Sequence, residues 1–193
     1  MKAVNIFESL KVSKSKVVVF SFSLYAFFLS MGILPFAMYG DQEHYIKFYN
    51  ALAGLSFLEG YTAQQDLLGT SEPGYFLFSY ISAIWLNLDR VLLFSILNTV
   101  LAYVVINWIV KNNVSTLVVV LLSVNFYLLI LFFSSERLKL ATIFFVLYLS
   151  CSGRYKFVFL AGSIFTHVQL IVFLISGFIL NFISSISSLT RLK

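Results

Sequence analysis

The chain has little charge, one cysteine and two histidines, and each shortage excludes a class of protein. Charged residues make up 11% of the 193 residues, against about a quarter in soluble globular domains. A single cysteine cannot form a disulfide framework, and with two histidines it cannot complete a standard zinc site. Phosphate-loop, dinucleotide-binding and zinc-protease motifs do not occur. We therefore predict no metal site and no cofactor.

Apolar residues dominate instead, at 60% of the chain. They form six runs separated by short polar turns, at residues 17–36, 74–88, 91–110, 117–133, 138–151 and 157–180. About 20 apolar residues are needed for a helix to cross a bilayer. We therefore predict an all-α fold, a polytopic transmembrane helix bundle of five or six spans that forms a single integral membrane domain over residues 1–193.

Two features of the pattern concern charge and span length. The run 74–88 would cover about 22 Å as a helix, short of the roughly 30 Å hydrocarbon core.

The net charge of +5 does not indicate a nucleic-acid partner, because Lys and Arg stand in short clusters between apolar runs. Polytopic membrane proteins use such clusters to fix their orientation.

The basic residues predict that orientation. If all six runs cross, the cytoplasmic side holds nine basic residues and the outer side four. If residues 74–88 lie along the surface instead, the split becomes seven to six. Because cytoplasmic loops are enriched in Lys and Arg, the count favours six spans. Both arrangements put the N-terminus in the cytoplasm and residues 37–73 outside.

The outer segment 37–73 is predicted to contain an amphipathic helix that lies in the membrane interface. Four apolar residues at spacings of 3, 4 and 3 would share one helix face: Tyr45, Phe48, Leu52 and Leu55. Asp41 stands where it would cap the start of this helix, and Asp89 where it would cap the span that follows. Residues 61–70 are polar and are predicted to form a loop.

Two carboxylates in the outer segment are candidate functional groups. Asp41 lies just beyond the first span, where it could accept a proton from a hydroxyl group. The alternative is a helix cap on a solvated acidic face. Glu72 precedes Pro73, which suits the first position of a helix. Glu72 would be functional only if it faced the same cavity as Asp41, and otherwise it is a surface residue.

Two further candidates lie at or within apolar runs. Arg137 opens the short run 138–151, and arginine makes planar, multidentate contacts with phosphate. The alternative is a topology marker whose side chain extends to the interface. His167 and Gln169 lie near the middle of the run 157–180, where unpaired polar groups are costly. They are predicted to face the bundle interior or a polar cavity, and the alternative for His167 is a structural group with its hydrogen bonds satisfied.

Taken in order, these features resemble the EpsG/Wzy-type polysaccharide polymerases of bacterial O-antigen, capsule and exopolysaccharide gene clusters. The matching pieces are Gly40-Asp41 with Tyr45 and Tyr49, Glu72-Pro73-Gly74-Tyr75, Arg137-Leu138-Lys139-Leu140-Ala141, the basic turn 153–156 and the segment 163–170 around His167. The chain departs from the family in two ways. Family members usually continue for several more spans, so a short or N-terminal-half form is expected, and Gln169 stands where the family often has Ser.

The resemblance implies a glycosyltransferase of the bacterial inner (plasma) membrane that joins oligosaccharide repeat units carried on undecaprenyl pyrophosphate. Asp41 or Glu72 would act as the base, and Arg137 or Arg154 would stabilise the departing pyrophosphate. His167 would pair with a polar group in the cavity, while Tyr45, Arg154 and Gln169 would contact the substrate. The expected partners are the lipid-linked glycan, the bilayer and other polysaccharide export or assembly proteins.

Two other functions stay open. The short length favours a non-catalytic membrane partner that modulates a larger polymerase. In a small transporter, His167 and Gln169 would line a path, although no paired halves with matching broken helices occur. The number of spans matters for the polymerase, because six crossings put Arg137 in the cytoplasm and five put it outside beside Asp41.

Overall fold

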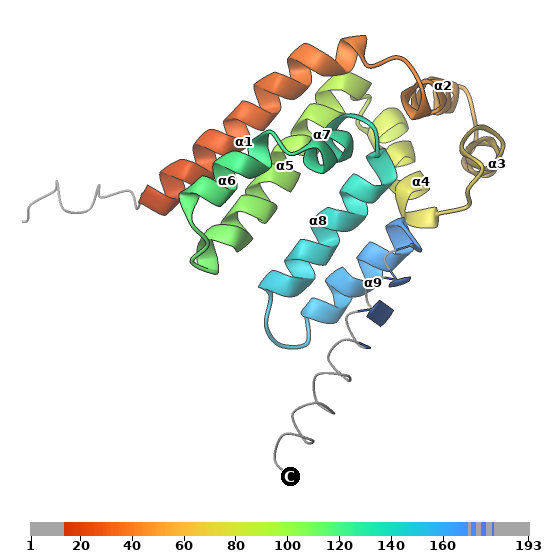
Figure 1. Ribbon diagram of the computed structural model, residues 1–193. Coiled ribbons are helices and arrows are strands. Elements are labelled where there is room, and N and C mark those ends of the chain that lie inside the picture. Colours follow the sequence, from red (N-terminus) through yellow and green to blue (C-terminus); the bar gives the residue numbers. More distant parts are fainter. Residues whose placement is uncertain (1–13, 170, 173–174, 177–178, 180–193) are drawn as a thin grey trace, which may run out of the picture.

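The computed structural model describes residues 14–169, 171–172, 175–176 and 179, and this part of the chain is all-helical (Figure 1). The elements in order are α1 (Lys14–Ile33), the 3₁₀ turn η2 (Leu34–Phe36), α2 (Asp41–Leu52), α3 (Phe57–Leu68), α4 (Pro73–Tyr80), the π-helical turn η3 (Ile81–Trp85), α5 (Arg90–Lys111), α6 (Thr116–Ser123), α7 (Phe126–Phe133), α8 (Glu136–Ser150) and α9 (Lys156–Thr166). The predicted all-α class is therefore confirmed for the described residues.

Helices α1 and α5 are the two longest helices of the described residues, and they pack side by side in antiparallel orientation (Figure 1). The segments Lys16–Phe36 and Arg90–Lys111 are long and apolar enough to span a membrane. Near the end where α1 finishes and α5 begins, the Asn98 side-chain amide donates to Ser30 Oγ over 2.8 Å. We call this end of the bundle the α2 end, because α2 and α3 lie across it (Figure 1).

Helix α2 has the predicted apolar face, but this face packs inside the protein, against Tyr75 of α4, and not in the membrane interface as the sequence predicts. Tyr45 and Phe48 on this face are 5% and 0% exposed. The predicted cap at Asp41 was wrong, because Gly40 is the N-cap and Asp41 is the first helical residue. Gly40 has φ +64°, a conformation that residues with a Cβ rarely adopt, so glycine is the residue suited to this turn.

The predicted loop at residues 61–70 was also wrong, because most of it lies in α3. Ser56 and Glu59 form a capping box that starts this helix, and Gly69 in the left-handed conformation ends it. The polar residue Gln64 is fully buried, and its side-chain amide donates to the Glu72 carbonyl over 3.1 Å. The polar residues of this segment therefore belong to a helix that packs beside α4, and not to an open loop.

Residues 73–88 begin and end at the α2 end of the bundle. Glu72, just before α4, accepts the bond from Gln64 of α3. At the other limit of the segment, the Tyr49 hydroxyl of α2 donates to the Leu88 carbonyl over 3.0 Å. Asp89 then caps α5 by accepting from the Leu92 amide, as the sequence predicts. Both limits of residues 73–88 therefore lie at the α2 end of the bundle.

Two predicted spans are broken. The run 117–133 contains α6 and α7, and Asn125 caps the second by accepting from the amides of Tyr127 and Leu128. The run 157–180 breaks at His167, which follows α9 in an extended conformation. Residues 170, 173–174, 177–178 and 180 of this predicted span lie outside the described residues.

Helices α8 and α9 form a hairpin that carries both ends of the candidate site. Helix α8 leaves the α2 end at Glu136, and α9 returns to it at Thr166 (Figure 1). Gly74 at the start of α4 contacts the last turn of α9, where no Cβ would fit beside Thr166. The chain thereby brings residues 72–74, 136–137 and 166–167 together.

Candidate functional site

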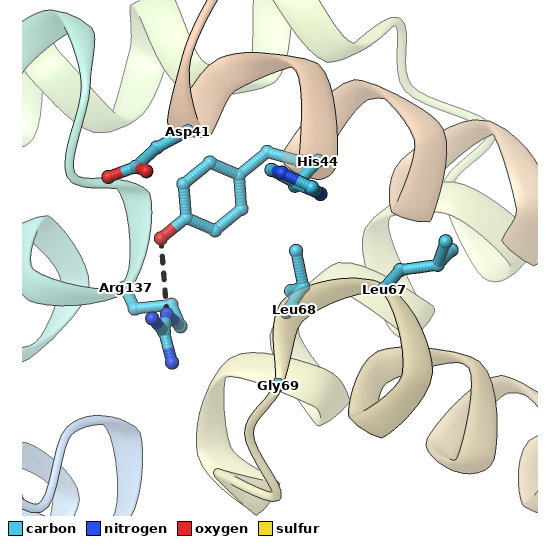
Figure 2. Close-up of a pocket in the computed structure, with 7 residues that line it drawn as sticks. Asp41, His44, Leu67, Leu68, Gly69 and Arg137 are labelled. Atoms are coloured by element: carbon cyan, nitrogen blue, oxygen red, sulfur yellow. Dashed lines mark hydrogen bonds between the residues drawn. The ribbon is translucent and has the colours of Figure 1, made fainter.

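A pocket of about 300 Å³ opens between α2, α3 and the start of α8 (Figure 2). Its lining is Asp41, His44 and Tyr45 from α2, Leu67, Leu68 and Gly69 from the end of α3, and Arg137 from α8. The side chains from α2 and α8 therefore supply an acid, an imidazole, a phenol and a guanidinium group, and those from α3 are apolar. The volume is at the lower limit of ligand pockets, which run from roughly 300 to 1,000 Å³.

Arg137 is held in this pocket by two partners. Its Nε donates to the Tyr45 hydroxyl oxygen over 3.1 Å, and its Nη1 donates to Glu72 Oε2 over 3.0 Å. The Arg137 side chain is 24% exposed, so part of it still faces the pocket. A guanidinium fixed from two directions is pre-oriented for an anion, which a flexible lysine would not be.

Glu72 joins Arg137 to His167. While Oε2 of Glu72 accepts from Arg137, Oε1 lies 2.5 Å from His167 Nδ1. The other ring nitrogen of His167, Nε2, lies 3.0 Å from Gln169 Oε1. The network thus runs from α2 through the start of α4 to the chain beyond α9. Glu72 and His167 are both buried.

Local structure places these groups. Pro73 occupies the first turn of α4, so Glu72 precedes the helix in an extended conformation. Arg137 lies in the first turn of α8. His167 has the extended backbone of a helix C-cap. Three helix ends therefore meet at the network, and each contributes one ionisable side chain.

The electrostatic environment fixes the ionisation of Glu72 and Arg137. Burial opposes the charge on Glu72, but the hydrogen bond from His167 and the charge of Arg137 outweigh burial and hold its pKa below 4.5. Burial also opposes the charge on Arg137, yet Tyr45 and Glu72 raise its pKa above the ordinary value. Burial raises the pKa of Tyr45 despite the opposing effect of Arg137. At neutral pH Glu72 is an anion, Arg137 a cation and Tyr45 a neutral phenol.

A second buried polar network lies beside the first. The Arg90 guanidinium donates to Glu136 and to the Gln42 side-chain oxygen. The Tyr75 hydroxyl donates to Glu136 Oε2 over 2.8 Å, and the Gln42 amide donates to the Ser134 carbonyl over 3.0 Å. This network joins α2, α4, α5 and α8, and it anchors the helix turn that carries Arg137.

Lys139, two residues after Arg137 on α8, is also buried. It is 0% exposed, its Nζ donates to the Phe132 carbonyl over 2.8 Å, and it lies 5.3 Å from the centre of the Phe94 ring. A charged group is rarely buried to this extent without such partners. The first turn of α8 therefore directs two neighbouring cations differently, Arg137 to the pocket and Lys139 to the core.

Six of the seven predicted site residues come together. Asp41, Tyr45 and Arg137 line the pocket, and Glu72, His167 and Gln169 continue from it. Arg154 is not among them, because it lies in the turn between α8 and α9, at the opposite end of the bundle. Helix α8 has 15 residues and separates the two places by about 22 Å.

Sequence reasoning missed His44, Gln42, Arg90 and Glu136. His44 lies one turn after Asp41 and lines the same pocket. Gln42 and Glu136 are sequence neighbours of Asp41 and Arg137, so the signal for them was adjacency to predicted site residues. Because successive residues of a helix point about 100° apart, each pair places one side chain in the pocket and one in the core.

The pocket can combine two chemical functions. Asp41 is exposed and supplies a carboxylate for proton transfer, and Arg137 supplies a cation for an anionic group. In the described part of the chain, no group of three or more His, Cys, Asp or Glu side chains is arranged to hold a metal ion.

Comparison of the chain with protein-family models, curated proteins and solved structures gave no match. The functional argument therefore depends on the geometry of the pocket and its network.

Proposed function

We propose that the chain is a membrane-embedded polysaccharide polymerase that joins oligosaccharide repeat units carried on undecaprenyl pyrophosphate. The observation that carries this proposal is the position of Arg137, which Glu72 and Tyr45 hold in the wall of a pocket that Asp41 also lines. A glycosyl transfer from a lipid pyrophosphate needs a base for the attacking hydroxyl and a cation for the leaving group, and these two side chains have that chemistry.

The proposed reaction uses the polar wall of the pocket, which carries both Asp41 and Arg137. A hydroxyl of one repeat unit attacks the anomeric carbon of another, and the bond from that carbon to the pyrophosphate oxygen breaks. Asp41 accepts the hydroxyl proton, and Arg137 stabilises the negative charge on the departing pyrophosphate. A pocket of about 300 Å³ accommodates the reacting groups, while the glycan and the lipid extend beyond it.

Glu72 and His167 have a positioning role in this proposal. Both oxygens of Glu72 are occupied, one by Arg137 and the other by His167. A carboxylate that holds two partners is a poor proton acceptor for the substrate, so the base is Asp41. His167 and Gln169 extend the network and fix the orientation of Glu72, and Arg154 has no role because of its distance.

The proposed location is the bacterial inner membrane, with the α2 end on the outer side and the N-terminus in the cytoplasm. Two helices have the length and composition of membrane spans. The return of residues 73–88 to the α2 end favours five crossings over six. With five crossings Asp41 and Arg137 share the outer side, as a common pocket requires.

A non-catalytic partner of a larger polymerase is the second candidate. It is favoured by the two contacts of Arg137 with Glu72 and Tyr45, which would also suit a purely structural ion pair. In that case the pocket would bind no substrate, and the charge of Asp41 would not matter for glycan synthesis.

Substitution of the two pocket residues separates these functions. In the source bacterium lacking the native gene, cells expressing Asp41→Asn or Arg137→Ala are expected to accumulate single repeat units. Long chains should fall by about 100-fold or more, the effect of losing a general base. Arg154→Ala is the matched control and should keep the wild-type ladder of chain lengths. Chain lengths unchanged in Asp41→Asn and Arg137→Ala, at equal protein levels in the membrane, would favour the non-catalytic partner.

A further inference from the structure

The charges of the described residues are segregated between the two ends of the bundle. All described acidic residues lie at the α2 end, and they are Asp41, Glu43, Glu59, Asp66, Glu72, Asp89 and Glu136. The opposite end carries Lys16, Lys111, Arg154 and Lys156. The cations of the opposite end therefore have no carboxylate partner among the described residues, so any bound counter-ion would come from outside this part of the chain.

Two of these cations share a groove between α1 and α5. The groove has a volume of about 540 Å³ and is lined by Lys16, Val19, Phe20, Ser23, Tyr103, Asn107, Val110, Lys111 and Asn113. The two lysines are at the limits of the two segments that are long enough to span a membrane. They therefore mark the end of the groove that would lie at the headgroup level of a bilayer.

The rest of the groove is largely apolar and accessible. Phe20 is 68% exposed and Tyr103 is 52% exposed, so these rings have surface for a further apolar group to cover. The Ser23 hydroxyl donates to the Val19 carbonyl over 2.8 Å, which satisfies that polar group within its own helix. Asn107 and Asn113 add amide groups near Lys111. The groove thus pairs a cationic mouth with an apolar floor.

We propose that this groove binds one anionic phospholipid of the surrounding bilayer. The lipid phosphate lies between Lys16 and Lys111, and an acyl chain covers the exposed rings of Phe20 and Tyr103. Two ammonium groups at one mouth repel each other, and a phosphate removes that repulsion. Basic pockets between membrane helices on the cytoplasmic side bind anionic headgroups for this reason. The proposal rests on the membrane location proposed above and does not depend on glycosyl transfer.

Lipid binding by the purified full chain tests the proposal. Native mass spectrometry would compare retention of phosphatidylglycerol with retention of phosphatidylcholine. Removal of one charge by Lys16→Gln or Lys111→Gln should weaken phosphatidylglycerol binding by about fivefold, and removal of both by roughly 25-fold. The double variant with Lys16→Arg and Lys111→Arg should bind like wild type. Arg154→Gln, at the same end but outside the groove, should also bind like wild type.

Three results would overturn the proposal. Equal losses in Arg154→Gln would mean that the whole end attracts anions without a defined site. Equal retention of phosphatidylcholine would remove the role of the lysines, and displacement of the lipid by millimolar inorganic phosphate would indicate a simple anion site. Asp41→Asn should retain phosphatidylglycerol, so a failure of the polymerase proposal would leave this result unchanged.

Discussion

At the scale of single residues, Glu72 organises the candidate site. It is 8% exposed and accepts hydrogen bonds on both oxygens, from Arg137 and from His167. Removing the carboxylate of a buried ion pair leaves the cation without a partner. The free energy of unfolding then falls by more than the intact pair contributes. Glu72 is therefore needed to keep Arg137 in the pocket, although it does not line the pocket itself.

The lowered pKa of Glu72 predicts how this contribution depends on pH. A carboxyl group whose pKa is lower in the folded state stabilises the fold above its unfolded pKa, and the stabilisation is lost as the pH falls through the folded pKa. For Glu72 the contribution is complete above about pH 4.5 and declines below it. Glu72→Gln should therefore lower the melting temperature at pH 7, and the difference from wild type should shrink as the pH falls below 4.5.

Melting curves of the detergent-solubilised protein across this pH range would measure the effect. Glu59→Gln is a suitable control, because Glu59 also has a lowered pKa but is exposed, and its hydrogen bonds within the described residues are to Ser56. Its substitution should change the melting temperature little at either pH. A constant difference between Glu72→Gln and wild type at all pH values would contradict the prediction.

Six residues that the sequence predicts for the site lie together in the structure, and four of them were predicted for one physical reason. Polar groups beside apolar runs are rare, so Asp41, Glu72, Arg137 and His167 stand out in a chain with 11% charged residues. The same criterion misassigned Arg154, because a boundary position does not reveal which end of the bundle it occupies. The pairing of Arg90 with Glu136 depends on contacts between α5 and α8, which no local pattern encodes.

At the scale of helices, hydropathy predicted where apolar segments lie but not where the backbone breaks. The run 117–133 is continuous in hydropathy, yet Asn125 starts a new helix within it. The run 157–180 similarly breaks at His167. The Asn125 side chain bonds backbone amides, and such a bond can begin a helix without changing the mean hydropathy. The His167 side chain instead contacts the side chains of Glu72 and Gln169. The breaks matter for function, since an unbroken helix would not place His167 beside Glu72.

The crossing of α4 and α9 offers a test at this scale. A Cβ on Gly74 would lie 2.7 Å from Thr166 Cγ2 and 2.8 Å from the Phe165 carbonyl oxygen. Gly74→Ala should push the end of α9 away, draw His167 from Glu72 and cost about 1–3 kcal/mol of stability. We also expect fewer long glycan chains, measured together with the melting temperature.

Gly54→Ala is the matched control for this substitution. A Cβ at Gly54 meets no atom within 4 Å, so the change should leave stability and glycan length near wild type. If Gly74→Ala behaved like Gly54→Ala, the close approach of α4 and α9 would not be what positions His167.

At the scale of the whole molecule, the burial of some basic residues decides whether they count in the charge rule for membrane orientation. With five crossings, Arg90 and Lys139 count on the outer side and make the split nearly even. The positive-inside rule concerns charges in loops, whereas Arg90 is 8% exposed and Lys139 is fully buried. Without these two residues, the distribution favours a cytoplasmic position for the end that carries Lys16 and Lys111. The charge rule and the five-span arrangement then agree.

Labelling of single cysteines tests this arrangement. In a Cys151→Ala background, Tyr39→Cys and Trp85→Cys report on the α2 end, and Tyr155→Cys reports on the opposite end. The three native side chains are 88%, 74% and 79% exposed, so cysteines there should be reachable. A membrane-impermeant maleimide added to intact spheroplasts should label the first two, and Tyr155→Cys should react only after permeabilisation.

The decisive comparison is between Tyr39→Cys and Trp85→Cys, because residues 73–88 lie between them. Labelling of both from outside means that this segment returns to its own side of the membrane, as α4 and η3 do in the bundle. If Tyr39→Cys reacted and Trp85→Cys were protected, the segment would cross. Arg137 would then lie in the cytoplasm and Asp41 outside. A pocket that both residues line could not exist in the membrane, and the proposed glycosyl transfer would lose its base and its cation together.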